Sequence, residues 1–498
     1  MVEKLARRPD RRFFHWDIEF PEAFIGFFDP NKSKIMHKER VKAGTAGFDA
    51  VVGNPPYDVL AETEKEQAAD LEDVLRYFAQ EPIYQPSHKG KQNLYKLFIC
   101  RNICLLRSAG RVGLIVPMPL LGDEQAVGVR GLLLSETSVR AIEAFPQKDD
   151  ARNRVFEDAK LSTCIFIAAK TKDDAEFRSR VHPANRIDPR SPSLLIRRSS
   201  VKLYDPENQP IVACSQEDWD LAVKIMSSGR MRRFGEYATA YQGEVNETTD
   251  GKKGNISTSP SDGPQILRGS NVCLYMLRGA SQGEPIYLRM EKYLKDKRAH
   301  AKAWHYRQNR AVFQRNSPQN NFRRLIACQI PSGHFCCDTI SYFPESESRL
   351  PLPLIVGLFN SKLLDWYFRL GSTNSKVNDY QVRILPVPFF SFQSRAKGLV
   401  QEFTESVERE ELGDSIGLLS SYLEEPPFAT EFMDCIVYLV KGICEMEASR
   451  GDIARTERSA LNVRARPYQE LIDAIIFRLA GLTDAEAEGL EQRLSKML

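Results

Sequence analysis

One short stretch, FDAVVGNPPY (Phe48–Tyr57), constrains the fold of this chain more than any other. Phe48–Val52 is a strand-like run that Gly53 and two prolines stop abruptly. An apolar run closed by glycine and proline is typical of a buried central strand of a parallel sheet. In open α/β sheets, ligands bind beyond the carboxyl ends of such strands. The residues Asn54–Tyr57 are therefore expected at a ligand-binding edge.

Strand-like and helix-like stretches alternate along residues 1–172. Apolar spacing predicts a helix over Asn93–Gly110, with Gly110 as its C-terminal stop, and a strand over Gly110–Pro117. Further elements are expected as a helix at Val129–Glu136 and strands at Ser138–Phe145 and Leu161–Lys170. This rhythm predicts an α/β fold with a doubly wound sheet.

The rest of the chain divides into a link and two zones, in keeping with the two to four domains expected for 498 residues. Residues 173–200, with prolines at 183, 189 and 192, are expected to form a loop-rich link. Residues 201–390 mix short strand-like pieces with turns and predict an α+β domain. Residues 396–498 have helical periodicity, and Thr483 followed by Glu486 predicts a capping box.

Composition excludes several classes of protein. With 42% hydrophobic and 27% charged residues, the chain is typical of a globular protein. The longest apolar runs, such as Leu161–Ala169, fall well short of the ~20 residues that span a bilayer. The basic N-terminal sequence lacks the apolar core of a secretory signal. Ten cysteines without a Cys-x-x-Cys pair predict reduced thiols, no metal site and a cytoplasmic location.

The residue types at the Asn-Pro-Pro-Tyr corner indicate a chemistry. Asn54 offers a side-chain carbonyl, and Pro55 presents a backbone carbonyl on a stiff turn with fixed φ. Two acceptors on a rigid corner suit an exocyclic amine, which carries two N–H donors. Tyr57 adds a flat face for stacking a base, and Gly53 permits the tight turn. The alternative is a proline-rich turn with no function.

The segment FDAVVGNPPY resembles motif IV of S-adenosylmethionine-dependent amino-methyltransferases, in the form found in adenine-specific DNA methyltransferases. FHWDIEFPEAF (Phe14–Phe24) resembles the segment that precedes this motif in type IIG restriction-modification methylases and in BREX-type phage-defence methylases. Other similar segments are NLYKLF and GRVGLIVP (motifs V and VI), VFEDAKLSTCIFIAAK (motif VIII), GLFNSKLLDWYFR and VNDYQVRILPVP (end of the target-recognition domain), and LAGLTDAEAEGLE (C-terminal tail).

The resemblance implies an enzyme that methylates N6 of an adenine flipped out of duplex DNA, with S-adenosylmethionine as cofactor. Asn54 and Pro55 would accept hydrogen bonds from N6, and Tyr57 and Phe156 would sandwich the base. Flipping costs a few kcal/mol, and aromatic stacking at roughly 1–3 kcal/mol per base would offset much of that cost. Phe98 would line the methionine end of the cofactor, or would be a core residue of its helix.

The resemblance further implies a catalytic domain at residues 1–172, a target-recognition domain that binds DNA at 201–390 and a helical region at 396–498. One departure from the family stands out. These enzymes carry a glycine-rich cofactor loop after a strand upstream of Asn-Pro-Pro-Tyr, and no Gly-x-Gly pattern occurs among residues 1–53. Asp17 and Glu19 are the weak candidates for acidic contacts to the cofactor. The chain is therefore expected to be the C-terminal part of a split or truncated methylase that needs an N-terminal partner.

Charge is concentrated in the middle of the chain. Residues Arg289–Arg324 contain eleven Lys or Arg against two acidic residues, whereas Glu402–Glu425 contain eight acidic residues and one Arg. The basic stretch predicts a polyanion-facing domain, with a solvated helix face as the alternative. Arg323 and Arg324 are expected to contact the duplex.

Two other functions are consistent with the sequence. The main rival is a catalytically inactive DNA-binding specificity subunit of a restriction-modification or phage-defence system. A methylase of RNA or of a protein glutamine ranks last, because it would not need about 160 residues of Arg- and Asn-rich recognition domain.

Overall fold

The computed structural model describes residues 14–24, 28–29, 34–35, 45–60, 68–279, 283–372, 375–423, 425–451 and 460–496. The chain divides into two compact units, Met1–Trp219 (unit 1) and Asp220–Leu498 (unit 2). None of the helices that the structure describes combines the length and the apolar character needed to cross a bilayer.

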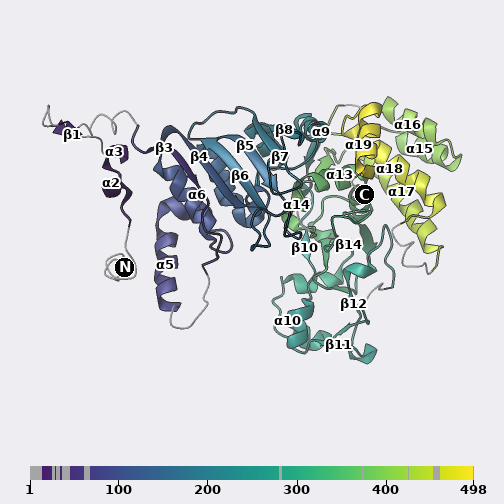
Figure 1. Cartoon of the computed structure of the whole chain (residues 1–498). Coiled ribbons are helices and arrows are strands. Elements are labelled where there is room, and N and C mark those ends of the chain that lie inside the picture. Colours follow the sequence, from purple (N-terminus) through teal and green to yellow (C-terminus); the bar gives the residue numbers. More distant parts are fainter. Residues whose placement is uncertain are drawn as a thin grey trace. The chain divides into compact units, whose positions relative to one another are not determined.

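Unit 1 is built on a six-stranded mixed sheet (Figure 1). Its strands, in spatial order, are β3 (Phe48–Gly53), β4 (Leu106–Pro117), β6 (Thr163–Ala169), β5 (Ser138–Phe145), β7 (Phe177–Val181) and β8 (Ser193–Ile196). β3 runs parallel to β4, and β6 lies antiparallel between β4 and β5. The α/β class predicted from the sequence is confirmed, with a mixed sheet.

The helices of unit 1 are α5 (Ala68–Gln80), α6 (Leu94–Leu105), α7 (Val127–Glu136), α8 (Arg198–Tyr204) and α9 (Gln216–Ser227), which begins in unit 1; α2 (Trp16–Glu19) and α3 (Pro21–Phe24) precede the sheet. The helix predicted to stop at Gly110 ends at Leu105, and β4 begins at once. Gly110 lies inside the strand instead. A Cβ there would lie 2.7 Å from the Phe48 carbonyl oxygen, so the glycine permits close approach of β3.

The prediction of a loop-rich link at residues 173–200 is wrong, because this stretch contributes two strands to the sheet. Phe177 and Ser179 of β7 are buried, and β7 pairs with both β5 and β8. The three prolines lie outside β7 and β8, in keeping with their inability to donate to a ladder.

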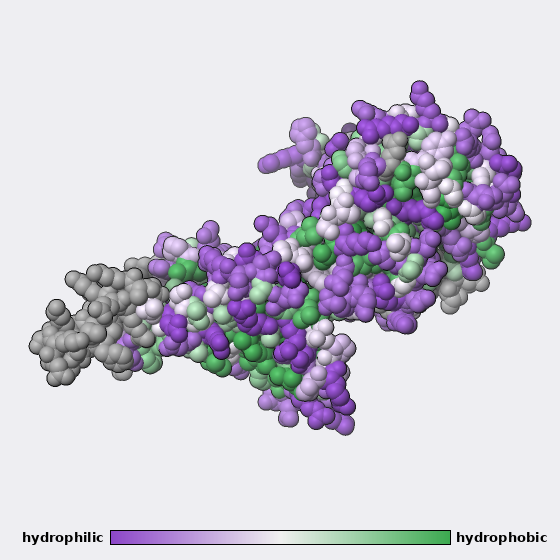
Figure 2. Space-filling model, turned by 90° about the horizontal axis from the view of Figure 1, so that it is seen from above, coloured by the Kyte–Doolittle hydropathy of each residue, from purple (hydrophilic) through white to green (hydrophobic). Residues whose placement is uncertain are grey.

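The two faces of the sheet differ in burial. Val112, Leu114 and Val116 of β4 are buried, and α6 packs against this strand. The alternate residues Gly113 and Ile115 are only half-buried. In register with Gly113 lie Val52 of β3, which is 85% exposed, and Ile167 of β6, which is 43% exposed. Figure 2 shows apolar residues open to solvent on unit 1 among hydrophilic ones.

β3 lies at the end of the sheet order and, within the described residues, pairs along one side only, with β4. Its start is held by the preceding helices, since the rings of Phe20 and Phe24 contact Phe48 edge to face at 5.3 and 5.1 Å. The amide of Gly47 also donates to the Ala23 carbonyl at 2.8 Å. These contacts fix the strand that leads into Asn54.

Unit 2 has a four-stranded sheet of β10 (Tyr241–Gln242), β17 (Ile340–Pro344), β14 (Arg310–Gln314) and β15 (Ala327–Ile330). Shorter strand pairs join β9 (Met231–Arg233) to β18 (Pro386–Pro388), β11 (Ile256–Ser257) to β13 (Tyr287–Leu288), and β12 (Ile266–Leu267) to β16 (Phe335–Cys336). Its helices are α10 (Glu247–Lys252), α11 (Met290–Leu294), α12 (Leu352–Phe359), α13 (Lys362–Gly371), α14 (Asp379–Arg383), α15 (Leu399–Glu408), α16 (Leu412–Ser421), α17 (Thr430–Ala448), α18 (Arg466–Leu479) and α19 (Asp484–Lys496).

The helical pattern predicted for residues 396–498 is confirmed by α15 to α19. The capping box at the start of α19 is also present. The Glu486 amide donates to the Thr483 hydroxyl at 3.3 Å, and the Thr483 amide donates to the Glu486 carboxylate at 2.9 Å.

Candidate active site

The Asn-Pro-Pro-Tyr corner lies at the edge of the sheet where β3 and β4 end. β6 begins at this same edge, because Thr163 pairs with Pro117. The loop of residues 146–162, which joins β5 to β6, therefore also reaches this edge. It carries Phe156, so the sheet topology brings Phe156 to Tyr57 across about a hundred residues of sequence.

The corner is open to solvent. Asn54 and Pro56 are exposed, Tyr57 is half-buried and Pro55 is buried. The Asn54 side chain forms no hydrogen bond with the residues that the structure describes. Its amide oxygen is therefore available to accept from a ligand, which is the arrangement that an amine-binding corner requires.

The Tyr57 ring is anchored. Its hydroxyl donates to the Ile115 carbonyl of β4 at 3.1 Å. Burial, followed by the neighbouring Cys164 thiol, raises the pKa of Tyr57 from 10.0 to about 12. The phenol is thus neutral at physiological pH, and its hydrogen bond to β4 holds the ring in place.

The aromatic sandwich expected around a flipped base is not preformed. The rings of Tyr57 and Phe156 meet edge to face, with centroids 5.9 Å apart and an interplanar angle of 68°. A base between two parallel rings needs roughly 7 Å, twice the ordinary carbon–carbon contact distance. Admitting a base between the two faces therefore requires the loop that carries Phe156 to move.

A family model of the Eco57I restriction-modification methylase matches this part of the chain, over residues 3–151. Residues 3–151 are therefore similar to the methylase of this family. The match confirms the resemblance to restriction-modification methylases, and it includes the Asn54–Tyr57 corner.

Individual proteins are also similar to this chain. The type II methyltransferase M.TthHB8I of Thermus thermophilus is 36% identical over 89 residues, which are 18% of this chain and 20% of the relative. The type IIL enzyme MmeI, solved with DNA, matches 92% of this chain and 58% of its own at 12% identity and a TM-score of 0.47. The type IIG endonuclease BpuSI matches 87% and 54% at 10% identity and a TM-score of 0.30. The chain thus spans less than two thirds of the length of these relatives.

Phe98, the residue expected near the cofactor, lies on α6 of unit 1 and is 42% exposed. Its neighbours Leu97 and Ile99 are buried. The alternative in which Phe98 is a core residue of its helix is therefore wrong, and its ring is free to contact a ligand or another polypeptide. Asp17 and Glu19 on α2 are likewise exposed.

The expected contact of Arg324 with DNA is contradicted by its position. The side chain is 1% exposed and its guanidinium lies 5.1 Å from the Phe368 ring. Burial, with repulsion from Arg369, lowers the pKa of Arg324 to about 10. Arg323 is half-buried, and its guanidinium donates to the Asn360 carbonyl at 2.7 Å, so it already has a partner within the protein. The charge pattern did not reveal that apolar residues 325–326 draw this segment into the interior.

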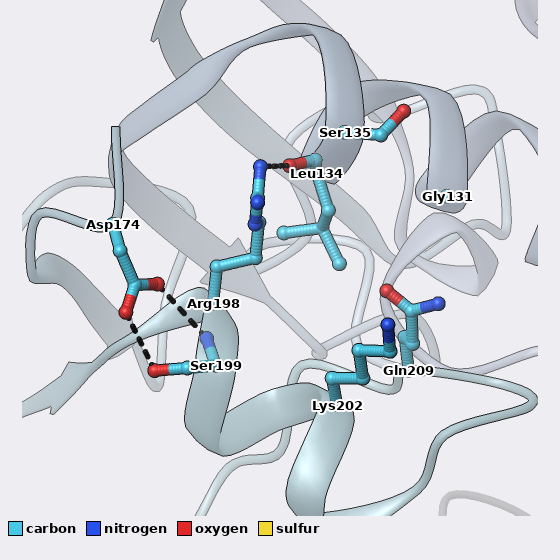
Figure 3. A pocket seen from close by; sticks show the side chains of 8 residues that line it. All are labelled: Gly131, Leu134, Ser135, Asp174, Arg198, Ser199, Lys202 and Gln209. Atoms are coloured by element: carbon cyan, nitrogen blue, oxygen red, sulfur yellow. Dashed lines mark hydrogen bonds between the residues drawn. The ribbon is translucent and has the colours of Figure 1, made fainter. Parts of the chain in front are cut away.

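A separate pocket in unit 1, with a volume of about 430 Å³, lies at the opposite edge of the sheet (Figure 3). It is near the start of β5 and the end of β6, and none of the predicted catalytic residues lines it. Its walls include Gly131 and Leu134 of α7 and Lys202 of α8. Asp174 there accepts from the amide and hydroxyl of Ser199. The described residues contain no cluster of His, Cys, Asp or Glu suited to a metal ion.

The raised pKa of Tyr57 makes a testable prediction. The Tyr57 phenol loses its proton at a higher pH in the folded protein than in the unfolded chain. The stability that it contributes to the folded state is therefore fully present below pH 10 and is lost as the pH rises through about 12. A spectrophotometric titration of the wild-type protein minus that of Tyr57→Phe should show no phenolate from this residue below about pH 11. A difference signal with its midpoint near the ordinary tyrosine value would contradict the anchored geometry.

Proposed function

We propose that the chain is the catalytic and recognition part of a site-specific DNA methyltransferase that transfers a methyl group to N6 of an adenine flipped out of the duplex. The observation that carries this proposal is the open Asn54 side chain at the carboxyl edge of β3, beside an anchored neutral Tyr57. The match of residues 3–151 to a restriction-modification methylase supports the choice of DNA as substrate.

The chain's residues act on the amine in two ways. The Asn54 side-chain oxygen and the Pro55 backbone carbonyl each accept one N–H of the adenine amino group. These bonds hold the nitrogen with its lone pair directed away from the ring system, which raises its nucleophilicity. The lone pair would form the new N–C bond as the sulfur–methyl bond of the donor breaks and its electron pair stays on sulfur; the surplus proton would then leave the nitrogen to solvent. Tyr57 and Phe156 hold the base by stacking once the loop has moved.

S-adenosylmethionine, when bound, supplies an electrophilic methyl group on sulfur. The described residues fit it only in part: Phe98 offers an aromatic face, while no glycine-rich turn lies beside β3 within the described residues. Within the described residues one side of β3 has no paired strand, which supports a site completed by a further strand that pairs along β3 and carries the cofactor loop. An N-terminal methylase fragment or subunit is the partner that would provide it.

The regions have separate roles in this proposal. Residues 1–172 hold the adenine, residues 201–390 position and read the duplex, and residues 396–498 form a helical support. Protein and DNA are expected to meet in the cytoplasm, where the ten thiols remain reduced.

The need for a partner is tested by calorimetry with S-adenosylmethionine. The purified chain alone should show no heat of binding at micromolar concentrations, because the cofactor loop is supplied by the partner. The chain co-purified with the product of its neighbouring reading frame should bind. Micromolar affinity of the chain alone would remove the reason for proposing a partner.

The function itself is tested by transfer of labelled methyl groups to a pool of duplex DNA, with the partner present. The expected result is incorporation into duplex that contains adenine and none into duplex that lacks it. The alternative, an inactive specificity subunit, predicts tight binding of duplex with no incorporation under any condition. Because both functions bind DNA, only the transfer assay separates them.

A further inference from the structure

We propose that one lobe of unit 2 contacts duplex DNA through a cationic strip of Lys295, Lys297, Arg298 and Arg307, and that Arg307 reads base sequence. This inference rests on the proposed function and assigns its DNA contacts to particular residues. It replaces the contacts expected of Arg324, which is buried, and of Arg323, whose guanidinium donates to the Asn360 carbonyl.

The lobe has an apolar core of its own. The lobe comprises α10, β11, β12, β13, α11, β16 and the short helix Lys302–Arg307. Figure 1 labels α10, β11 and β12 of this lobe. Its core consists of Val245, Ile266, Ile286, Leu288, Tyr293, Ala303, Phe335 and Cys337. Tyr306 stacks on Phe335 with ring centroids 4.4 Å apart, so the short helix is fixed to this core. The charged strip therefore lies on a lobe with a packed core.

Several basic residues of the Arg289–Arg324 stretch have ion-pair or hydrogen-bond partners within the protein. Arg310 is buried in an ion pair with Glu244 at 2.9 Å. Lys302 donates to the carbonyls of residues 242 and 243 at 2.8 and 3.0 Å. Arg289 pairs with Asp262 at 3.0 Å. These cations have partners within the protein and are not available to a ligand.

Lys292 donates to the Lys253 carbonyl at 2.8 Å and Arg315 to the Asn378 side chain at 3.3 Å, so four cations of the stretch remain. Lys295, Lys297, Arg298 and Arg307 are all exposed, and none forms an ion pair with a residue that the structure describes. Lys297 lies over the Tyr293 ring at 4.5 Å, while the Arg298 carbonyl accepts from the Trp304 indole N–H at 2.9 Å. These contacts hold the Lys297 side chain against Tyr293 and the backbone of Arg298 beside Trp304. Exposed cations on a rigid surface attract a polyanion, and phosphates are the anions that a DNA duplex presents.

Arg307 differs from the other three because its guanidinium is already held in place. It lies 4.2 Å from the centroid of the Trp304 ring, and its Nε donates to the Tyr306 hydroxyl at 3.3 Å. Trp304 itself is pinned by the hydrogen bond to Arg298. The two Nη groups of Arg307 remain as a planar fork. A fork of this kind matches the O6 and N7 acceptors of guanine in the major groove.

The test measures duplex binding by fluorescence anisotropy over a range of salt concentrations. The triple variant Lys295→Gln, Lys297→Gln, Arg298→Gln should reduce the slope of log Kd against log salt by about 2.7, at 0.9 per lost phosphate contact. The matched control Lys397→Gln, Arg466→Gln, Lys496→Gln removes the same charge from exposed positions in the helical region and should change the slope by less than one.

Arg307 is tested by selection from a randomised duplex library. Arg307→Lys keeps the charge but loses the planar fork, so the preference for the selected sequence over random duplex should fall by about tenfold. Arg307→Ala should lose the same sequence preference, and its slope of log Kd against log salt should fall by no more than one unit. Circular dichroism of each variant at the assay temperature confirms that the lobe remains folded.

The outcomes separate this inference from the proposed function. If the wild-type protein binds duplex and the triple variant keeps the full salt slope, the strip is not the contact surface, while the methyltransferase proposal stands. If Arg307→Lys selects the same sequence as strongly as wild type, the assignment of base reading to Arg307 is overturned. If the variants lose affinity for polyglutamate and not for duplex, the strip serves an acidic protein instead. Failure of the wild-type protein to bind any duplex would overturn both proposals.

Discussion

Asn54→Ala is expected to lower the rate of methyl transfer by about 10²–10³-fold, the usual cost of removing one positioned polar group at a reacting centre. The Asn54 side chain is exposed and makes no hydrogen bond within the described residues, so its loss should leave folding unchanged. Duplex affinity should stay within about twofold, because the proposed DNA contacts lie on another unit. The measurement is single-turnover methyl transfer with the partner present, alongside anisotropy.

The control for this prediction is Asn54→Asp, which keeps an acceptor oxygen at the same position. It should retain more activity than Asn54→Ala, since one N–H of the amine still has its acceptor. Activity of Asn54→Ala within threefold of wild type would show that the corner does not hold the reacting amine.

Asp365→Ala is expected to lower the free energy of unfolding by about 3–5 kcal/mol, the cost of breaking a buried charged pair. Asp365 is 1% exposed, and its carboxylate accepts from the amides of Arg324 and Leu325 at 2.7 and 2.8 Å. The second oxygen accepts from the Arg369 Nε at 2.8 Å. The substitution leaves these two buried N–H groups without an acceptor and removes the carboxylate that pairs with Arg369. Chemical denaturation followed by tryptophan fluorescence measures the loss.

Asp365→Asn serves as the matched variant. It keeps an oxygen for the two backbone amides but replaces the oxygen that accepts from Arg369 with an NH₂ donor, so it should cost about 1–3 kcal/mol. Both variants should leave the salt slope of DNA binding unchanged at temperatures where they remain folded, because this network is interior. A loss of under 1 kcal/mol for Asp365→Ala would contradict the assignment of Arg324 and Leu325 to the interior.

The strands with a strong local signal could be predicted from the sequence. Ser138–Phe145 was placed without error, and the strand at Phe48 ends one residue beyond the predicted Val52. Both are apolar-rich runs bounded by turn residues. The first four residues of β4, LRSA, carry no such signal. They form a strand because they extend the pairing of β4 with β3. β7 alternates Phe177 and Ser179 with arginines, a pattern too short and too polar to separate from a loop.

The candidate site could be predicted in part. The position of Asn54–Tyr57 could be predicted, because β3 ends at Gly53 and the residues after the end of a strand lie at an edge of the sheet. The meeting of Tyr57 with Phe156 depends on the order of β4, β6 and β5, which local sequence does not encode. The same limit misplaced Arg324, because a run of arginines does not reveal which of them has a buried carboxylate such as Asp365 beside it.

The central claim is that Asn54 and Pro55 present two acceptors to the amino group of an unpaired adenine. The most direct test is mass spectrometry of nucleosides from duplex DNA treated with S-adenosylmethionine, the wild-type chain and its partner. N6-methyldeoxyadenosine should be the methylated product, and it should disappear with Asn54→Ala. A methyl group on cytosine, or N6-methyldeoxyadenosine formed undiminished by Asn54→Ala, would contradict the account.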